Sequence, residues 1–385
     1  MQRLRSAPSR TSAASRWTGA YEAGRLQPAR TTILARMAPA RSTVRERSAW
    51  AGIVCFLCFC MGCGCERLPT GPPAAGGTLR AVTLAEWSAD GLSGSGADAA
   101  LDSIAATGAN TVVIIVTAYM ADARASSLRA NDARTPSPGA VRHAITHARA
   151  LGLAVVLKPH VDLEDGSWRG AVTPAEPDAW FSSYRAFLRP WAILADSVGS
   201  PAFVVGTELA GTLTNSSQWR ALIRELRQLV RGRLSYAASW DEASRVPFWS
   251  ELDLVGIDAW FPVTQRRDAG RVDMLAGWQP WLARLRTLGR QTGKPILMTE
   301  LGYRSVDGAG MAPYNFSTPG AADPREQADL YWAALQATAG EDEITGLCWW
   351  NCLADGSGGP ANTDFTPLGK PAVRVLAAAW GSATP

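Results

Sequence analysis

The sequence predicts a single (β/α)8 barrel, and three observations support this fold. Eight short apolar runs rich in β-branched residues follow one another along residues 78–381, and segments of helical periodicity separate most of them. The pattern covers about 305 residues, which is the size of one such barrel and leaves no room for a second domain. Hydrophobic residues make up 47% of the chain and charged residues 19%, which excludes wholesale disorder and a multispanning membrane protein. A doubly wound open sheet is the runner-up, but no glycine-rich phosphate loop follows the first run.

The eight apolar runs are expected to be the strands of the barrel. They span residues 79–84, 111–116, 154–159, 202–206, 234–239, 254–259, 295–299 and 346–350. Reactive side chains should then cluster where these strands end, because active sites of this fold lie at the carboxyl ends of the strands.

The segments of helical periodicity are expected to surround the strands. They span residues 97–107, 138–151, 178–197, 218–230, 274–292, 324–339 and 371–380. Ser137-Pro138, Thr173-Pro174 and Asp323-Pro324 each place a capping side chain before a proline suited to a first helical turn. The connection over residues 241–251 is too short for a good helix.

Residues 37–65 are predicted to be a signal peptide of the lipoprotein type. Three arginines precede an uncharged apolar run of about a dozen residues, which is too short to span a bilayer as a helix. The stretches that end at Cys63 and Cys65 loosely resemble a lipoprotein box, in which the cysteine is lipidated. A plainly cleaved signal and an uncleaved anchor are the alternatives. Zinc binding by Cys60, Cys63 and Cys65 is disfavoured, because no second cysteine cluster completes a four-ligand site.

The other N-terminal segments are expected to lie outside the folded domain. Secretion signals normally start a chain, so translation is expected to begin at Met37, and residues 1–36 are then an upstream extension. A disordered targeting or regulatory tail is the alternative. Residues 66–77 are rich in proline and glycine and are predicted to form a linker, and residues 78–385 form the barrel domain.

The net charge of +4 belongs to the N-terminus. Residues 1–50 hold ten arginines and two glutamates, whereas the rest of the chain has 28 basic and 32 acidic residues. A basic surface for nucleic acid is therefore not expected. The mature protein is predicted to be an exported monomer that contacts the membrane only through an N-terminal lipid anchor.

Glu208 and Glu300 are the principal candidates for catalysis. Each stands at the carboxyl end of an apolar run, the fourth and the seventh, and a carboxylate there costs free energy unless it is hydrogen-bonded or opens into a polar cleft. The fourth and seventh strands face each other across an eight-stranded barrel, so both groups should point into one mouth. Two opposed carboxylates are what cleavage of a glycosidic bond requires. The alternative is a structural ion pair at each strand end.

Four motifs resemble the retaining glycoside hydrolases whose two glutamates lie on strands four and seven. They are Val205-Gly-Thr-Glu-Leu209, Met298-Thr-Glu-Leu-Gly302, Leu157-Lys-Pro-His160 and Cys348-Trp-Trp-Asn351. Within that clan the sequence is most similar to glycoside hydrolase family 113, whose characterised members are β-1,4-mannanases. The resemblance implies that Glu208 is the general acid/base and Glu300 the nucleophile, that no cofactor or metal takes part, and that β-mannan is the leading substrate. Xylan and β-glucan remain open.

Two positions depart from the pattern of the clan. Thr207 stands where many relatives have an asparagine that binds the sugar 2-hydroxyl. Trp260 stands where relatives commonly have a tyrosine that touches the nucleophile. The indole nitrogen of Trp260 can donate a hydrogen bond but can neither accept one nor titrate.

Further side chains are predicted to bind substrate. His160, with Asp162 beside it, follows the third strand, where it can bond a sugar hydroxyl or brace the barrel, and Lys158 is also predicted to bind substrate. Among the aromatic side chains, one of Trp349 and Trp350 should point into the mouth because neighbours on a strand face opposite sides. The remaining candidates are Trp87, Trp168, Trp260 and Tyr303.

The remaining histidines and cysteines are expected to be structural. His143 and His147 are four residues apart in a helical segment and should lie on a solvated face. Cys348 and Cys352 are expected to be free thiols, because an extended strand carries them too far apart for a disulfide.

Two rival functions belong to other classes. A surface lipoprotein that binds carbohydrate without cleaving it would not need opposed carboxylates. A metal-dependent barrel hydrolase is disfavoured because few histidines stand at strand ends.

Overall fold

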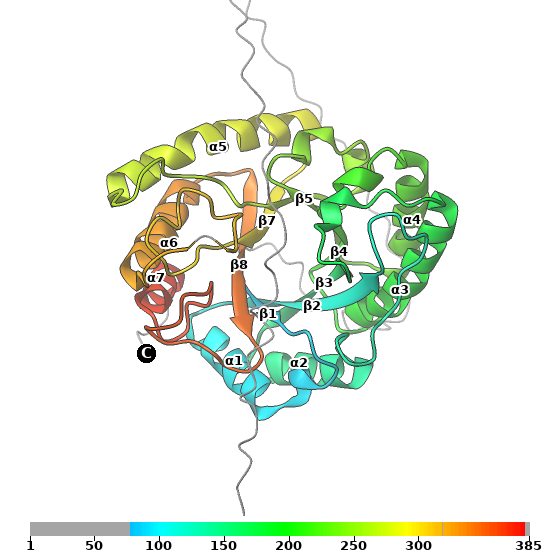
Figure 1. The fold of residues 1–385 in the computed structure, drawn as a ribbon, viewed down its shortest axis with the longest axis horizontal. Helices are drawn as coiled ribbons and strands as arrows, with labels where there is room; N and C mark the ends of the chain where they lie inside the picture. Colours follow the sequence, from blue (N-terminus) through cyan, green and yellow to red (C-terminus); the bar gives the residue numbers. More distant parts are fainter. Residues whose placement is uncertain (1–77, 318, 382–385) are drawn as a thin grey trace, which may run out of the picture. The chain divides into compact units, whose positions relative to one another are not determined.

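The computed structural model describes residues 78–317 and 319–381 and confirms the barrel. Eight strands pair in chain order, and β1 closes the ring by pairing with β8 (Figure 1). The strands are β1 (Leu79–Ala85), β2 (Thr111–Met120), β3 (Ala154–Leu163), β4 (Ala202–Thr207), β5 (Arg233–Ser239), β6 (Leu254–Asp258), β7 (Ile296–Leu301) and β8 (Ile344–Leu353). All eight predicted strands are present, and β2, β3 and β8 run several residues beyond their predicted ends.

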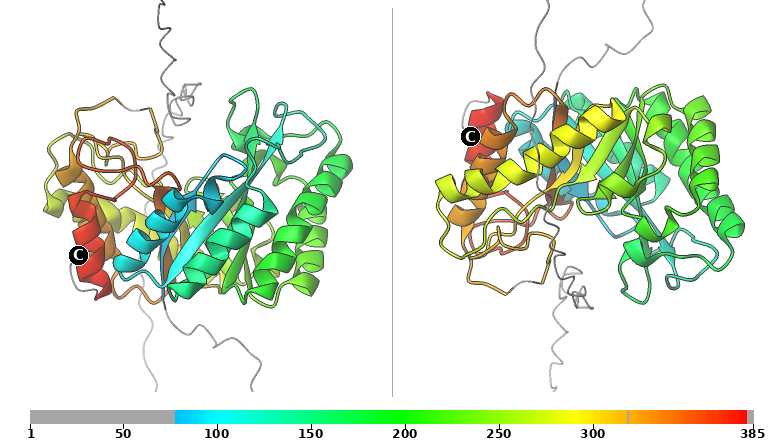
Figure 2. Two further views of the ribbon diagram at one scale, coloured as in Figure 1. Left: turned by 90° about the horizontal axis from the view of Figure 1, so that it is seen from below. Right: turned by 90° about the horizontal axis from the view of Figure 1, so that it is seen from above.

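Helices pack around the outside of the strands (Figures 1 and 2). They are α1 (Ser95–Ala106), α2 (Pro138–Ala150), α3 (Pro177–Ser197), α4 (Ser216–Leu229), α5 (Arg271–Thr292), α6 (Pro324–Thr338) and α7 (Pro371–Trp380). Between β5 and β6 the chain forms only two short 3-10 turns, which agrees with the predicted lack of a helix there.

Two of the three predicted caps are correct. The side chains of Ser137 and Asp323 accept hydrogen bonds from the first turns of α2 and α6. The Thr173-Pro174 prediction is wrong, because α3 begins at Pro177. The backbone N–H of Thr173 instead donates to the carbonyl of Ala123, so Thr173 belongs to the loop that precedes the helix.

The apolar core has two parts. The outer part lies between the strands and the helices and includes Trp180, Trp219 and Trp278, each fully buried. The inner part fills the barrel with small and branched side chains and is closed at one end by aromatic rings, among them Trp260 and Trp350. Membership in one part or the other therefore shows which face of its strand a side chain occupies.

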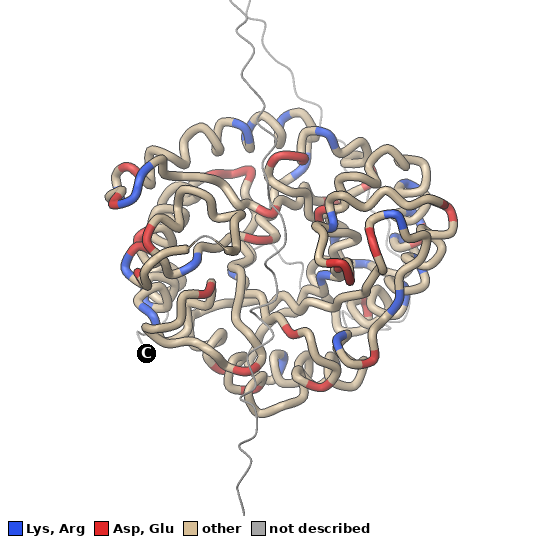
Figure 3. The backbone as a smooth tube through the Cα atoms, in the orientation of Figure 1, with Lys and Arg blue, Asp and Glu red and all other residues tan. Residues whose placement is uncertain are grey.

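The predicted upstream extension (1–36), signal peptide (37–65) and linker (66–77) lie outside the described residues. In the part of the chain that the structure does describe, no helix is long and apolar enough to cross a bilayer. Lys and Arg positions are interspersed with Asp and Glu positions along this part (Figure 3).

Candidate active site

Glu300 points into the barrel because β7 contains a bulge. Ile257 pairs with Met298 and Asp258 pairs with Glu300, so Thr299 is an extra residue on β7. In a regular strand Glu300 would share a face with Met298, whose side chain lies in the outer core. The bulge turns Glu300 inward, as bulges beside active sites commonly do.

Two side chains donate hydrogen bonds to the Glu300 carboxylate, and the Glu300 side chain is 4% exposed. Lys158 donates to its Oε1 at 2.6 Å, and the indole nitrogen of Trp260 donates to its Oε2 at 3.2 Å. Lys158 also donates to Asp258 at 2.8 Å, and the hydroxyl of Thr299 donates to the same Asp258 oxygen at 2.7 Å. Glu300 is thereby tied to β3 and β6 as well as to its own strand.

The Lys158 ammonium lies between two carboxylates that repel each other. Burial opposes the charged form of Lys158, but the carboxylates of Asp258 and Glu300 outweigh it and raise the pKa of Lys158. Burial and the charge of Glu300 raise the pKa of Asp258 to about 7. A fully buried ammonium group persists here because it has two carboxylate partners.

Glu208 follows β4 in a strained backbone conformation. Its φ of 52° lies in the left-handed region, which non-glycine residues rarely adopt. The Tyr236 hydroxyl accepts a hydrogen bond from the N–H of Leu209 at 2.8 Å and donates to Glu242 at 3.0 Å. At Gly206 a Cβ would lie 2.7 Å from the ring of Trp219, so the approach to this turn is closely packed. These contacts hold the backbone at Glu208 in place.

The Glu208 carboxyl has one cation near it, at a longer distance. The Arg169 guanidinium lies 3.9 Å from Glu208 Oε2 and donates to Asp162 at 2.6 Å. Burial raises the pKa of Glu208 to about 8, with further increases from the negative charges of Asp258 and Glu300. Glu208 and Glu300 are therefore close enough to interact, as the opposed strands predict, and Glu208 holds its proton at neutral pH.

His160 lies beside Glu300 as a neutral ring. Burial, followed by the charges of Arg169 and Lys158, lowers its pKa well below the ordinary value. Its Nε2 is 3.5 Å from Glu300 Oε1, and neither ring nitrogen has a hydrogen-bond partner in the described part of the chain. The ring is parallel to that of Trp350 at a centroid distance of 6.0 Å. An uncharged ring with two unused nitrogens suits a sugar hydroxyl.

Trp350 and Trp260 form an aromatic wall with two residues that sequence reasoning missed. The edge of Trp260 meets Trp350, Phe316 and Phe365 at centroid distances of 5.3 to 6.4 Å. Phe316, from the loop after β7, is 48% exposed. An exposed ring in a loop carries no periodic signal, so the sequence did not single it out.

Three predicted substrate-binding residues are corrected. Trp349 stacks on Tyr331 of α6 at 3.8 Å, and both it and Tyr303 lie fully buried in the outer core. Both rings face the helices, so neither reaches the mouth. Of the tryptophan pair, Trp350 is the inward-facing member, as strand alternation predicted. Lys158 is fully buried against two carboxylates, so it holds Glu300 rather than a sugar.

The other predicted positions have mixed outcomes. Trp87 is half-buried against the inner core, and Trp168 is half-buried over Gly170 in the loop after β3. The Thr207 hydroxyl donates to the carbonyl of Pro159 at 3.2 Å and so braces the backbone. Trp260 donates its indole N–H to Glu300, as its chemistry predicted.

Two charged residues of the site were missed by sequence reasoning. Asp258 ends an apolar strand, as both glutamates do, so the same sequence pattern could have predicted it as a site residue. Arg169 lies in a 3-10 turn after β3, and no local pattern marks it as a partner of Glu208.

Residues outside the site behave as expected. His143 and His147 lie on α2 and pair with Asp98 and Asp102 of α1 at 2.9 Å. Cys348 and Cys352 are buried free thiols on opposite faces of β8, one in each part of the core. Within residues 78–317 and 319–381, no cluster of three or more His, Cys, Asp or Glu side chains could hold a metal ion.

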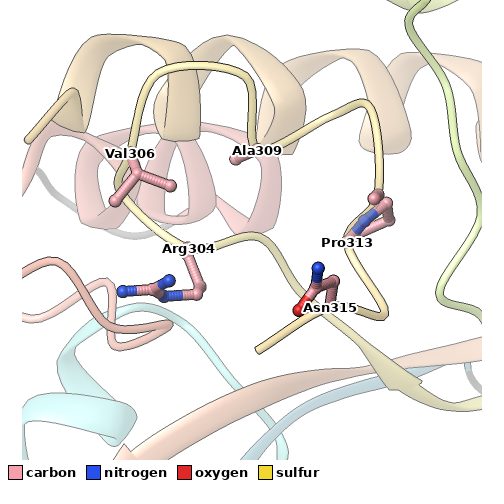
Figure 4. A pocket seen from close by; sticks show the side chains of 6 residues that line it. Arg304, Val306, Ala309, Pro313 and Asn315 are labelled. Atoms are coloured by element: carbon pink, nitrogen blue, oxygen red, sulfur yellow. The ribbon is translucent and has the colours of Figure 1, made fainter. Parts of the chain in front are cut away.

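A small pocket lies within the loop after β7. Its lining residues are Arg304, Val306, Ala309, Ala312, Pro313 and Asn315 (Figure 4). Neither Glu208 nor Glu300 lines it.

Comparison with known proteins identifies the family. The sequence pattern of Glycoside Hydrolase Family 113 matches residues 86–370, which is most of the chain and nearly all of the barrel. The chain belongs to glycoside hydrolase family 113. No curated protein matches the sequence significantly.

Solved structures of family 113 enzymes superpose on this member over the whole barrel. A family 113 β-1,4-mannanase in a complex is 25% identical, with a TM-score of 0.73 over 80% of this chain and 100% of its own. The family 113 β-mannanase AaManA of Alicyclobacillus acidocaldarius, in complex with ManMIm, is 26% identical, with a TM-score of 0.73 over 79% of this chain and 97% of its own. A family 5 mannosidase of Rhizomucor miehei shares only the fold, at 10% identity and a TM-score of 0.52 over 80% of this chain and 92% of its own. This family 113 member is therefore a glycoside hydrolase.

Proposed function

We propose that this glycoside hydrolase cleaves β-1,4-linked mannan with retention, using Glu208 as general acid/base and Glu300 as nucleophile. The observation that carries the proposal is the contrast between the two carboxyl groups in one mouth. Glu300 accepts hydrogen bonds from the Lys158 ammonium and from the Trp260 indole N–H. Burial raises the pKa of Glu208 to about 8, so Glu208 is protonated at neutral pH. Environments that differ in this way assign an acid and a nucleophile.

The reaction then proceeds in two steps. The Glu300 carboxylate attacks the anomeric carbon, the glycosidic C–O bond breaks, and Glu208 gives its proton to the departing oxygen. Glu208, now a carboxylate, takes a proton from water, the water oxygen bonds to the same carbon, and Glu300 is released. His160 and the wall formed by Trp260 and Trp350 are proposed to bind the sugar at the cleavage point.

β-Mannan is the proposed substrate because two matched family 113 structures carry the name β-mannanase. Xylan and β-glucan are the alternatives, since β-glucan differs from β-mannan only in the orientation of the 2-hydroxyl, and xylan in that orientation and in lacking the hydroxymethyl group. The test is to incubate the chain from Thr78 onward with mannan, xylan and β-glucan oligosaccharides and to separate the products. Release of manno-oligosaccharides alone supports the proposal. Cleavage of xylan or β-glucan but not mannan contradicts the substrate assignment, and binding without cleavage favours the carbohydrate-binding alternative.

We also infer that the enzyme is exported and lipid-anchored. The support is the sequence of residues 37–65, with arginines before an apolar run and cysteines after it. Mass spectrometry of the mature N-terminus, beside Cys63→Ser and Cys65→Ser variants, tests this inference. A mature protein without a lipid, found only in the soluble fraction, contradicts the anchor.

A further inference from the structure

Each proposed catalytic glutamate shares its cation with a second buried carboxylate. Lys158 lies between Glu300 at 2.6 Å and Asp258 at 2.8 Å. Arg169 lies between Glu208 at 3.9 Å and Asp162 at 2.6 Å. We call these two sets the lysine unit (Glu300, Lys158, Asp258) and the arginine unit (Glu208, Arg169, Asp162). The four side chains of Asp258, Lys158, Glu300 and Asp162 are each at most 4% exposed.

The proposed reaction moves one negative charge between the units. In the first step Glu300 becomes an uncharged ester, while Glu208 loses its proton to the leaving oxygen and becomes charged. In the second step the water proton neutralises Glu208, and breakage of the ester bond restores the charge on Glu300. Each cation therefore loses the charge of its catalytic partner during half of the cycle.

A buried cation without a counterion is costly, and removing one partner of a buried ion pair typically costs several kcal/mol. We propose that Asp258 and Asp162 are positioning residues that keep Lys158 and Arg169 paired when Glu300 and Glu208, respectively, are uncharged. This inference rests on the proposed function, since it assigns the half-reaction in which each aspartate matters.

The electrostatics of the lysine unit fit this role. The charge of Glu300 is one of the causes that raise the pKa of Asp258, the larger being burial. That charge disappears when Glu300 is esterified, so Asp258 becomes more acidic at the stage when Lys158 has no other carboxylate partner. Asp258 can balance the charge of Lys158 without moving, because it already accepts hydrogen bonds from Lys158 and from the Thr299 hydroxyl.

Four other titratable groups lie around the two units, and three of them are uncharged. They are His160 on β3, Cys348 on β8, Tyr119 on β2 and Glu242 after β5. Burial lowers the pKa of His160, raises that of Cys348 to about 12 and raises that of Tyr119, so all three are neutral. Burial raises the pKa of Glu242 to about 7, and its carboxyl is bonded to Tyr236 rather than to either cation.

The two aspartates should affect opposite half-reactions. The test substrate is an aryl β-glycoside with a good leaving group, made from the sugar that the wild type cleaves, so that formation of the intermediate needs little acid catalysis. For such a substrate kcat/KM reports the first step and kcat the second.

Asp258→Asn leaves Lys158 with Glu300 as its only carboxylate partner. Charge loss at Glu300 then strands the ammonium group, so the first step slows while the second does not. We expect kcat/KM to fall on the order of 10²-fold with kcat nearly unchanged, and the burst of aryl alcohol seen with the wild type to form correspondingly more slowly.

Asp162→Asn leaves Arg169 with Glu208 alone. The guanidinium then stabilises the Glu208 carboxylate more strongly and makes it a weaker base for the second step. We expect kcat to fall roughly tenfold or more with kcat/KM nearly unchanged, and the intermediate to accumulate. With an oligosaccharide, which needs the acid, the alkaline limb of kcat/KM should move to lower pH.

Two controls separate this role from general damage. Asp196→Asn removes the carboxylate of an exposed pair with Arg231 and should change neither constant. In a Lys158→Met background, Asp258→Asn should no longer lower kcat/KM, because the aspartate acts through the lysine.

Three results would overturn the inference. Both variants lowering kcat and kcat/KM by the same factor would indicate a structural role, and both behaving as wild type would indicate none. An effect of Asp258→Asn that persists in the Lys158→Met background would show that Asp258 does not act through Lys158. If Asp258→Asn does not fold, Asp162→Asn alone decides by the same criteria. Failure of the proposed function itself would appear differently, as a wild type that cleaves no glycoside.

Discussion

Glu300 and Glu208 are the same residue type at opposed strand ends, yet their surroundings differ in three ways. Glu300 lies within β7 and is turned inward by a bulge, whereas Glu208 lies after β4 with a φ of 52°. The carboxylate of Glu300 is 4% exposed and that of Glu208 is 13% exposed. The cation of Glu300 is in hydrogen-bond contact at 2.6 Å, and that of Glu208 is 3.9 Å away.

This difference teaches that a carboxyl group takes its role from its partners rather than from its depth alone. Glu300 is the more deeply buried of the two, but the ammonium and indole N–H groups replace the hydration that its charge loses. Glu208 has no such close donor among the described residues, so burial dominates and the proton stays.

Glu300→Gln should abolish turnover, because an amide cannot form the glycosyl ester. We expect kcat to fall by about 10⁴-fold or more, on the scale of losing a covalent nucleophile. In a Glu300→Ala variant, whose shorter side chain vacates that face, sodium azide should attack the anomeric carbon, restore the release of an activated aryl group and give an α-glycosyl azide. Formation of the β-azide would contradict the assignment of Glu300 as the nucleophile. NMR of the product distinguishes the α-azide from the β-azide.

Glu208→Gln should reduce activity in a way that depends on the leaving group. Oligosaccharide cleavage needs proton donation and should fall by about 10²-fold or more. Formation of the intermediate from a dinitrophenyl glycoside should be nearly unaffected, since that group leaves without a proton. Equal losses of kcat/KM for the two substrates would show that Glu208 is not the acid.

The pH dependence of kcat/KM on oligosaccharides should show an alkaline limb near pH 8. The pKa of Glu208 is raised to about 8, so the acid form persists at neutral pH and is lost as the pH rises through this value. An alkaline limb near pH 5 to 6 would mean that burial does not govern Glu208 in the working enzyme. In the Glu208→Gln variant this limb should disappear.

Tyr236→Phe should loosen the backbone at Glu208 without touching Glu300. The change removes the acceptor for Leu209 N–H and leaves the buried Glu242 without its donor, at a cost of about 1 to 3 kcal/mol. Denaturant unfolding measures that loss, and we expect activity to fall with it. The acid-dependent step should be affected more than cleavage of a dinitrophenyl glycoside. A loss confined to stability would show that the brace does not position the acid.

His143→Ala should have almost no effect on activity. The side chain is exposed on α2 and pairs with Asp98, and surface pairs contribute about 0 to 1 kcal/mol. Thermal unfolding and the standard assay check this expectation. A large loss of activity would point to a function on this face, remote from both glutamates.

Much of the fold was open to prediction because its signals are local. Strand and helix periodicity gave eight strands in the right order, and the paired signal of Glu208 and Glu300 came from carboxylates that end apolar runs. Alternation along β8 also predicted correctly that only one of Trp349 and Trp350 faces inward. The cap predicted at Thr173 is wrong, because Thr173 lies in the loop before α3, and α3 begins at Pro177.

Periodicity and motifs were enough to predict the barrel, the family and the positions of Glu208 and Glu300 at strand ends. Tertiary structure decided their surroundings. Lys158 and Glu300 are 142 residues apart, and only closure of the barrel brings the ammonium group to the carboxylate. The bulge at Thr299 depends on how β7 pairs with β6 and β8, so it cannot be predicted from the periodicity of β7 alone. Local patterns specify which face a side chain occupies, whereas protonation depends on charges that only the folded chain brings together.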